Sequence, residues 1–599
     1  MARASSPPNN LVCSIKYVWH ISKSYVLLVV VSAILTSTNN VFNVYILKFL
    51  IDALMSSNNR QFYYVLFSML LVSLAVNVIN ALVSHYVAPQ LKNSLEQGIQ
   101  QDIFQQSLSY SLEAYDNEEF YDLYYFTLHN SRAAMVNMVN SLGTLVSTCL
   151  SVVGIASIIV QYDTWCLLII AAGVASSSYF LFKTQDARHN FNLHSVTPIR
   201  KINYVDRVFY LVDYSKELRT YKNSDLLFSY YRESWAHLLS IVKMCGKRLV
   251  TLDFSNKTSL TLSHLATLLY FGVNALAGHL EMSSFVMLFN GAQQIGAQLN
   301  SIIGIFPVWH SFCRTLEKYY EFMKKEDSCR KNGIMINRIQ TVSFEHVSFA
   351  YDDRRTILRD VSLNMGGNIK RVAIVGRNGS GKSTLVKLLL GFYPVNKGRI
   401  RINGIDISNI DIDSFRERIS VIYQDFQLFS FTIAQNVMMK YTISKEDEMA
   451  TLKALELVGL YDKVIRLPKG IHSTISKEFD ADGIVFSRGE LQKLALARAY
   501  ARNGDMIIMD EPYSSYDPIS QEDVMTALRN VSRNKILIII SHGLVNLHEM
   551  DLIAVIDAGR LVELGTHREL IRNRGEYSNM YDVQLRKYGL NRGFEEDMI

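Results

Sequence analysis

The sequence is poor in charge and in cysteine, and both shortages narrow the possible functions. Only 19% of the 599 residues are charged, the formal net charge is +6, and no run of lysine and arginine stands out. Nucleic-acid-binding proteins usually carry such a basic face, so we expect no nucleic-acid partner. The six cysteines form no C-x-x-C pair, which argues against a disulfide or zinc framework. Cys149 and Cys166 lie in apolar surroundings and are interpreted as small core residues.

Apolar residues, in contrast, make up 49% of the chain, and long apolar segments crowd its first 310 residues. Each long segment is near or above the ~20 residues that cross ~30 Å of hydrocarbon, so we predict membrane-spanning helices. The first segment is long and has no clear cleavage site, which favours a retained span over a signal peptide. The six predicted spans are 24–50, 62–88, 138–160, 165–183, 253–277 and 281–308.

The placement of lysine and arginine predicts the orientation of these spans. The stretch from Lys183 to Arg248 is rich in both residues, whereas the short connections 161–164 and 278–283 contain neither. Because positive residues favour the cytoplasmic side, we expect that stretch and the N-terminus inside and the short connections outside. The region after the last span should then lie in the cytoplasm as well.

Two predicted cytoplasmic stretches, 89–137 and 184–250, are too long to be simple loops. We predict that they extend the membrane helices, and that each turns over in a short helix that docks on the domain that follows the spans. The candidate docking segments are Tyr115–Phe120 and Asp213–Leu218. A solvated charged turn is an equally favoured interpretation of any single residue in them.

Polar residues recur inside two of the predicted spans. Asn290, Gln294 and Gln298 are spaced four apart and share one helical face, and so do Asn39 and Asn43. Because polar groups are costly in hydrocarbon, these side chains should face a neighbouring helix or a water-filled cavity. Lining a substrate path and hydrogen bonding between helices are equally favoured interpretations.

The strongest chemical signal lies at residues 376–384, which read G-x-x-x-x-G-K followed by serine and threonine. They follow a predicted strand at 372–375 and precede a predicted helix at 385–390, the context of a phosphate-binding loop rather than of a chance glycine-rich turn. Glycines let backbone N–H groups approach a polyphosphate at a helix start. Lys382 is expected to reach the β- and γ-phosphates, and Ser383 to bind Mg²⁺. The predicted nucleotide contacts of this loop are Gly376, Asn378, Gly379, Ser380, Gly381, Lys382, Ser383 and Thr384.

Two later strands are followed by residues suited to phosphoryl transfer. The apolar segment 506–510 ends in Asp510 and is followed at once by Glu511. Asp510 is placed to hold Mg²⁺, and Glu511 is placed to polarise the attacking water. A second apolar segment, 535–540, is followed closely by His542. This histidine could contact the γ-phosphate, and a purely structural role is the alternative.

Residues 486–490 read Phe, Ser, Arg, Gly, Glu and lead into a predicted helix with the sequence A-L-A-R-A. Here the chain resembles the ATP-binding cassette (ABC) family, whose signature reads L-S-G-G-Q ahead of such a helix. Ser487 and Gly489 match, whereas Arg488 replaces a glycine and Glu490 replaces a glutamine. The resemblance implies that Ser487 and Gly489 contact nucleotide held by the opposite chain. Glycine permits close backbone approach, so we favour obstruction of closure by Arg488. Contact of its guanidinium with the phosphate is the alternative.

Other motifs occur in the order of the ABC family. Tyr351 stands where the family stacks an aromatic ring on adenine, and Gln424 matches the loop that joins Mg²⁺ to the transport domain. Ser514–Asp517 matches the loop that crosses to the other ATP site. The resemblance implies ATP and Mg²⁺ as cofactors. It implies as catalytic residues Lys382, Gln424, Glu511 and His542. It implies as Mg²⁺ ligands Ser383, Gln424 and Asp510.

The implied fold is an α-helical transmembrane domain with six spans and long cytoplasmic extensions, followed by an α/β ATPase domain of the ABC type. We assign the transmembrane domain to 1–325, a linker to 326–340, the cassette to 341–585 and a tail to 586–599. Six spans are half of the family's usual twelve, so we expect a dimer of identical chains or a pair with a related half-transporter. Fusion of both domains in one chain favours an exporter in the cytoplasmic membrane, with its N-terminus and cassette inside.

Two stretches bear on the cargo. Ser111–Asp116, with Tyr121 and Asp122 beyond it, and Lys477–Gly483 resemble half-transporters of Gram-positive peptide-antibiotic clusters, including the lantibiotic exporters. The predicted cargo is therefore a modified peptide such as a lantibiotic-like precursor. A lipid or drug exporter is the alternative, and a regulatory membrane protein that hardly hydrolyses ATP is the third hypothesis. Because only about twenty residues precede the first span, we expect no fused protease domain that cleaves leaders.

Overall fold

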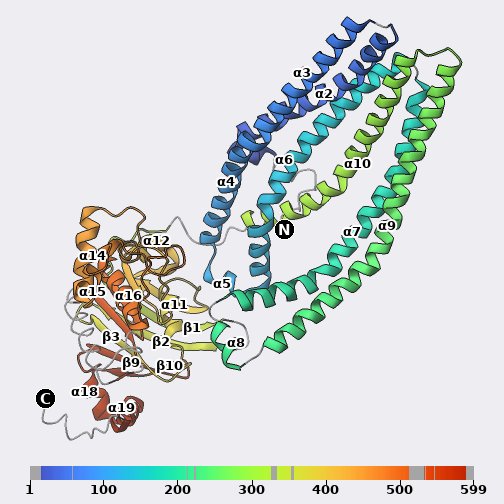
Figure 1. Cartoon of the computed structure of the whole chain (residues 1–599). Coiled ribbons are helices and arrows are strands. Elements are labelled where there is room, and N and C mark those ends of the chain that lie inside the picture. Colours follow the sequence, from blue (N-terminus) through green and yellow to red (C-terminus); the bar gives the residue numbers. More distant parts are fainter. Residues whose placement is uncertain are drawn as a thin grey trace. The chain divides into compact units, whose positions relative to one another are not determined.

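The structure is a computed structural model in which the chain divides into two compact units (Figure 1). The first unit is Met1–Leu108 with Glu118–Glu326, and the second is Ser109–Asn117 with Asp327–Ile599. The residues that the structure describes are 15–56, 58–162, 164–211, 214–221, 224–324, 333–351, 356–502, 504–511, 532, 535–541, 543–544 and 547–587.

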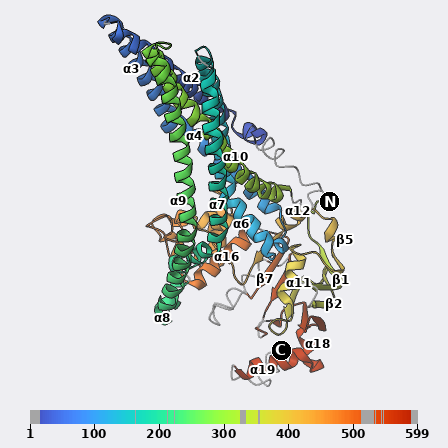
Figure 2. The same ribbon diagram turned by 90° about the vertical axis from the view of Figure 1, so that its right-hand side faces the viewer.

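The first unit consists of helices. In Figures 1 and 2, α7 and α9 run side by side along their length, and α10 and α2 both pack against α6. A helix pairs its own backbone groups, which is what a hydrocarbon environment demands. The helices are α2 (Lys23–Met55), α3 (Asn59–Leu82), the π-helical turn η1 (Val83–Val87), α4 (Ala88–Ser109), α6 (Glu118–Val160), α7 (Trp165–Tyr210), α8 (Ser215–Tyr221), α9 (Ser224–Leu276) and α10 (Met282–Lys324).

Several of these helices are much longer than a bilayer is thick. Helix α9 has 53 residues. At 1.5 Å per residue this is about 80 Å, against about 30 Å of hydrocarbon. The stretches predicted as helical extensions, 89–137 and 184–250, indeed lie mainly in α4, α6, α7 and α9.

The outer surfaces of these helices are apolar. Helix α3 has no buried residue, and Leu70 and Leu74 on it are 59% and 58% exposed. Surfaces of this kind suit lipid rather than water.

Five stretches are both long and apolar enough to cross a membrane, and α10 is not among them. Helix α10 is long enough, but its described residues are more polar than those of the other five stretches, so the sixth span stays a prediction. The stretches that are long and apolar enough are Lys23–Met55, Asn59–Ser109, Glu118–Val160, Trp165–Arg188 and Ser224–Leu276.

Close approach between α2 and α6 depends on small residues. A Cβ atom at Gly143 of α6 would collide with the side chain of Val29 on α2. In the same interface the Tyr25 hydroxyl donates to Asn140 Oδ1 over 2.8 Å. Small residues and interhelical hydrogen bonds take the place of the hydrophobic effect inside a membrane, where lipid tails are as apolar as leucine.

The polar residues predicted to share a helical face differ in their surroundings. Gln294 Nε2 donates to Asn290 Oδ1 on the same helix over 3.3 Å. Asn40 Nδ2 donates to a serine hydroxyl of α6 over 3.2 Å, whereas its neighbours Asn39 and Asn43 each have a buried Oδ1 atom without a partner among the described residues. The hydrogen bond between helices is therefore made by Asn40, next to the predicted pair Asn39 and Asn43. For Asn39 and Asn43 themselves, lining a substrate path remains an open interpretation.

The second unit is an α/β domain with two sheets. One has the order β2-β1-β4-β5 and is antiparallel; the other has the order β10-β9-β3-β8-β7-β6, with parallel pairing from β9 to β6. Strands buried on both faces read as continuous apolar runs, as β3 and β8 do. The strands are β1 (Thr341–Ala350), β2 (Thr356–Gly366), β3 (Arg371–Val375), β4 (Lys397–Ile402), β5 (Ile405–Asp406), β6 (Ile419–Ile422), β7 (Met506–Asp510), β8 (Ile536–Ile540), β9 (Leu552–Asp557) and β10 (Arg560–Gly565).

Helices and short turns surround these sheets, and two hydrophobic cores result. One core joins helices such as α13, α14 and α16 to the six-stranded sheet, and the other lies between the two sheets around α11. The helices and 3-10 turns are α11 (Lys382–Leu389), η3 (Ile407–Asn409), α12 (Ile412–Glu417), α13 (Ile433–Met438), α14 (Lys445–Leu457), α15 (Tyr461–Ile465), η4 (Gly470–His472), α16 (Arg488–Arg502), α18 (His567–Asn573) and α19 (Glu576–Lys587).

A short turn from between the long helices belongs to this second unit. It contains α5 (Leu112–Tyr115) and lies within Ser109–Asn117. The Tyr393 hydroxyl donates to Asp116 Oδ2 over 2.7 Å, which fixes the turn to the α/β domain. Docking at the first predicted segment is therefore observed up to Asn117. Of the second segment, Asp213 lies outside the described residues, and the rest falls in the first unit with α8.

Candidate nucleotide-binding site

The phosphate loop connects β3 to α11, as the sequence predicts. Gly376 has φ +151°, and a Cβ atom there would collide with the carbonyl oxygen of Ile556 on β9. Gly381 caps α11 in a left-handed conformation with φ +106°. Only glycine adopts both conformations without strain, so these two positions set the path of the loop. The eight-residue helix α11 then begins directly at Lys382 and directs its first N–H groups towards the loop.

Lys382 is folded back over this loop. Its Nζ atom donates to the carbonyl oxygens of Gly376 and Arg377 over 3.0 and 2.9 Å. Burial lowers the pKa of Lys382, and the nearby carboxylates of Glu511 and Asp510 oppose that shift. The charged ammonium therefore lies in a partly dry pocket where a phosphate would stabilise it.

A buried hydroxyl in the same loop also fits an anionic ligand. Ser380 is only 4% exposed, and its Oγ atom has no hydrogen-bond partner among the described residues. A buried hydroxyl without a partner costs free energy, which a phosphate oxygen accepting its hydrogen bond would recover. Donors of this kind, with the start of α11 behind them, suit a polyphosphate.

The two predicted carboxylates lie at the end of β7. Glu511 has φ +49°, a left-handed conformation that costs a non-glycine residue roughly 1–2 kcal/mol. Its backbone N–H donates to the carbonyl oxygen of Ile540 over 3.0 Å, and its Oε2 atom accepts from Gln424 Nε2 over 2.9 Å. The structure therefore brings together Gln424 and Glu511, which lie 87 residues apart. Backbone strain of this kind is typical of functional sites.

The oxygen atoms of Ser383, Gln424 and Asp510 are hard ligands of the kind Mg²⁺ prefers. Among the residues that the structure describes, no three His, Cys, Asp or Glu side chains form a group that could hold a metal ion by themselves. A hydroxyl, an amide and one carboxylate beside bound phosphates are a typical arrangement for Mg²⁺ in nucleotide sites.

Tyr351 lies in an aromatic cluster at the other end of the loop. Its ring contacts the rings of Phe349 and Tyr393 edge-on at 4.9 and 5.1 Å between centroids. Its hydroxyl lies 3.3 Å from Thr384 Oγ1. Tyr351 remains 44% exposed, so it retains surface on which a base can stack. Thr384 is buried, and its hydroxyl faces this tyrosine.

The signature forms the start of α16. The backbone N–H of Ser487 donates to Glu490 Oε2 over 2.9 Å, and the N–H of Glu490 lies 3.4 Å from Ser487 Oγ, which together form a capping box. Lys463 Nζ lies 2.6 Å from Glu490 Oε1. The hydrogen bond from Lys463 lowers the pKa of Glu490. Ser487 and Arg488 are exposed, and Gly489 is half-buried.

The ABC transporter family model matches residues 358–514, from β2 through the phosphate loop and the signature to the end of β7. The chain is an ABC transporter. The prediction of an ATP-hydrolysing ABC transporter is therefore confirmed, and with it the prediction of a nucleotide site.

Curated relatives extend this result beyond the cassette. The transporter is 29% identical to the subtilin transport ATP-binding protein of Bacillus subtilis over 80% of this chain and 78% of the relative. It is 30% identical to an ATP-dependent lipid A-core flippase of Photobacterium profundum, over 52% of each chain. It is 32% identical to a fatty acid ABC transporter ATP-binding/permease protein of Mycobacterium bovis, over 53% of this chain and 50% of the relative. The chain thus spans about half the length of the last two relatives.

Solved structures show the fold of both units. A bacterial Atm1-family ABC exporter with ATP bound superposes with a TM-score of 0.77 at 20% identity, over 94% of this chain and 98% of the other. The predicted fold, a helical membrane domain followed by an ABC ATPase domain, is confirmed. The apolar helices and this fold make the transporter a multi-pass membrane protein.

Some predicted site residues of the transporter cannot be compared with the structure. His542 and the segment Ser514–Asp517 lie outside the described residues, so their roles stay predictions. Sequence reasoning missed Lys463, because a lone lysine 27 residues before its partner gives no signal. It also missed Arg498, which donates to the carbonyl oxygens of Gln427 and Asn436 over 3.0 and 2.9 Å. The arginine of A-L-A-R-A could have drawn attention to this link between α16 and the segment after Gln424.

Proposed function

We propose that this ABC exporter uses ATP and Mg²⁺ to export a modified peptide across the cytoplasmic membrane. The observation that carries the proposal is the similarity to the subtilin transport protein, which extends over 506 residues. An alignment of that length exceeds the second unit and includes much of the helical domain. Cargo is selected in the helical domain, so this similarity bears on the cargo more directly than a match of half the chain does.

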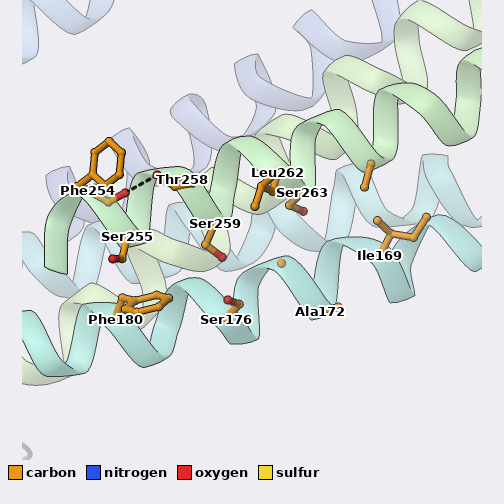
Figure 3. Close-up of a pocket in the computed structure, with 12 residues that line it drawn as sticks. Ile169, Ala172, Ser176, Phe180, Phe254, Ser255, Thr258, Ser259, Leu262 and Ser263 are labelled. Atoms are coloured by element: carbon orange, nitrogen blue, oxygen red, sulfur yellow. Dashed lines mark hydrogen bonds between the residues drawn. The ribbon is translucent and has the colours of Figure 1, made fainter. Parts of the chain in front are cut away.

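A groove in the helical domain supports a cargo of this type. It lies between α7 and α9 and has a volume of about 640 Å³, within the range of about 300–1,000 Å³ for ligand pockets. In Figure 3, Ser176 on α7 and Ser259 on α9 point towards each other across the groove. The lining residues, none of them charged, are Ile169, Ala172, Gly173, Ser176, Phe180, Phe254, Ser255, Thr258, Ser259, Leu262, Ser263 and Ala266.

Hydroxyls beside aromatic and aliphatic side chains suit an uncharged, amphipathic segment. A peptide backbone carries donors and acceptors that need partners away from water. The serine hydroxyls offer such partners, and Phe180 and Phe254 offer apolar surface. Lipids and drugs also combine apolar surface with few polar groups, and the flippase and the fatty acid transporter keep this second candidate open.

In the proposed cycle the residues of the cassette act by position and charge. The loop 376–384 and the start of α11 bind the phosphates, and Lys382 turns from its own loop carbonyls to the β- and γ-phosphates. Ser383, Gln424 and Asp510 would hold Mg²⁺, which neutralises phosphate charge when bound. Glu511 holds the attacking water and accepts its proton, and His542 contacts the γ-phosphate.

ABC exporters of this type work as dimers, and we propose two identical chains here. The motivation is that the signature serine, Ser487, is exposed at the start of α16. With Gly489 it would complete the site of the partner. We also propose that the lysine-rich and arginine-rich extensions of α7 and α9 and the whole cassette, 341–585, lie in the cytoplasm.

The test is cargo-stimulated hydrolysis by the full chain in liposomes. We expect a lantibiotic-type precursor peptide to stimulate ATPase activity several-fold and to accumulate inside inverted vesicles. Glu511→Gln is the control, because it keeps the shape of the side chain, loses the charge that polarises water and should bind ATP while hydrolysis falls about a hundredfold or more. Stimulation by lipids or drugs without any by peptides would favour the second candidate.

A further inference from the structure

Lys463 is a residue without a role in the function described so far. It lies on α15, and its ammonium contacts residues on both sides of Ser487. Nζ lies 2.6 Å from Glu490 Oε1 and 5.2 Å from the ring centroid of Phe486. One lysine therefore holds the residue before the signature serine and the residue three positions after it.

Glu490 uses both of its oxygens in this arrangement. Oε1 accepts from Lys463, while Oε2 accepts from the backbone N–H of Ser487 over 2.9 Å. A glutamine, as found in the family's signature, has one acceptor and one donor at these positions, and its amide group would face the ammonium with a donor. The lysine and the carboxylate therefore form a matched pair at a position where the signature departs from the family pattern.

The pair also has an electrostatic consequence. Glu490 introduces a negative charge three residues from the serine that should meet the γ-phosphate of the partner chain. Like charges repel, and the carboxylate is only partly screened because its side chain is 25% exposed. Lys463 neutralises this charge locally. The same carboxylate is tolerated at the start of α16, where the helix dipole favours negative charge.

We propose that Lys463 is a positioning residue for the signature. It compensates the charge of Glu490 and holds Ser487 ready to meet the phosphate bound by the partner chain. This inference rests on the proposed function, because it requires that two cassettes close on ATP. Lys463 then affects hydrolysis through Glu490 and Ser487. It does not contact the reacting atoms, which Lys382 and Glu511 face.

The structure contains a matched control for this arrangement. At the start of α14, Lys440 Nζ lies 2.7 Å from Asp447 Oδ1, and Asp447 Oδ2 accepts from the backbone N–H of Ser444 over 3.1 Å. This is the same combination of lysine, carboxylate and capping box, but it lies outside the signature. Lys440→Gln therefore reports the effect of losing such a pair on folding alone.

The experiment measures basal ATPase activity of the full chain in lipid nanodiscs, so the cargo need not be known. We expect Lys463→Gln to lower kcat about fivefold to tenfold, with a smaller change in KM for ATP. Lys463→Arg should retain most of the activity, because it keeps the charge. Lys463→Gln combined with Glu490→Gln should recover to within about twofold of Glu490→Gln alone, since no carboxylate is then left unpaired. Lys440→Gln should stay near the unmodified protein.

A second measurement separates charge from packing. Raising NaCl from low to high concentration should partly restore Lys463→Gln, because salt screens the unpaired carboxylate, and it should leave the double variant unchanged. Unaltered activity in Lys463→Gln, or failure of Glu490→Gln to rescue it, would overturn the proposal. If Lys463→Gln does not fold, the double variant and Lys463→Arg still decide it. Absence of ATPase activity in the unmodified protein would instead contradict the proposed function.

Discussion

The two units of this transporter differ in what they expose and in where their polar groups lie. In the cassette, β3 and β8 are apolar and buried along almost their whole length, and polar groups gather in the loops that follow β3 and β7. In the helical unit, α3 exposes its leucines, while hydroxyls such as those of Ser147 and Ser177 are buried between helices. The difference follows from the two solvents, water and lipid. We infer that the functional polar groups of the cassette lie in loops, whereas those of the helical unit lie between helices.

If this contrast is right, a loop substitution in the cassette should remove activity without unfolding the protein. Lys382→Ala removes the charge that faces the phosphates, and we expect ATP hydrolysis to fall by about two orders of magnitude or more and transport to be lost. Coupled-enzyme ATPase assays and thermal unfolding measure the two effects separately. Near-normal hydrolysis would reject the assignment of the phosphate loop.

A substitution between helices should instead lower the stability of the helical unit. Gly143→Leu places a side chain where even a Cβ atom collides with Val29, and we expect the helical unit to lose about 1–3 kcal/mol of stability. Gly272→Leu is the matched control, because a Cβ atom there meets no described atom within 4 Å apart from its chain neighbours and its own helix backbone. Thermal unfolding in detergent compares the two. Equal melting temperatures would show that Gly143 does not set the approach of α2 and α6.

Removing the hydrogen bond at Asp116 tests whether cargo binding in the helical unit is coupled to hydrolysis in the cassette. Tyr393→Phe keeps the ring against Tyr351 and removes the hydroxyl that donates to Asp116, a hydrogen bond worth about 0.5–1.5 kcal/mol. We expect cargo stimulation to fall about threefold while basal hydrolysis changes little. Tyr441→Phe, at a tyrosine that is 93% exposed, serves as the control. A change in basal hydrolysis alone would place the role of this hydroxyl at the nucleotide rather than at the turn.

The smallest expected effect concerns the signature. Arg488 is the exposed first residue of α16, and glycine in its place would let the opposite nucleotide approach more closely. Arg488→Gly should raise basal hydrolysis about twofold and weaken its dependence on cargo. Lys445→Gly, at the first residue of α14 behind a similar capping box, controls for the cost of glycine at a helix start. A lower basal rate in Arg488→Gly would mean that the arginine assists catalysis.

Much of the cassette could be predicted from the sequence because its chemistry is local. The phosphate loop, Glu511 and the helix after the signature each follow from residues that are neighbours in the chain. Contacts between distant residues could not be predicted in this way. The bonds from Gln424 to Glu511 and from Tyr393 to Asp116 join positions that lie 87 and 277 residues apart, and no periodicity records them.

The helical unit was predictable in a different respect. Hydropathy indicates that a segment is a helix and roughly how long it is. The predicted spans fall within helices except for residues 277 and 281, which lie just outside helix ends. It does not indicate which neighbour a polar residue meets. Asn40 bonds to α6, in an interface where Val29 and Val41 of α2 lie against Gly143 and Gly154 of α6. Helix α10 also shows that a polar stripe can make a predicted span less apolar than the other long helices.

The hydrogen bond between Asp116 and Tyr393 has a consequence for the order in which the chain is made. The turn around α5 is synthesised early, and 277 further residues must follow before Tyr393 exists. At about 5–20 residues per second, this takes roughly 15–55 s on the ribosome. During that interval the turn has no cassette to join. Expression of 327–599 alone would produce the opposite defect, a cassette whose Tyr393 never meets the turn. Co-expression with the first half of the chain, rather than a longer refolding time, should then restore its stability.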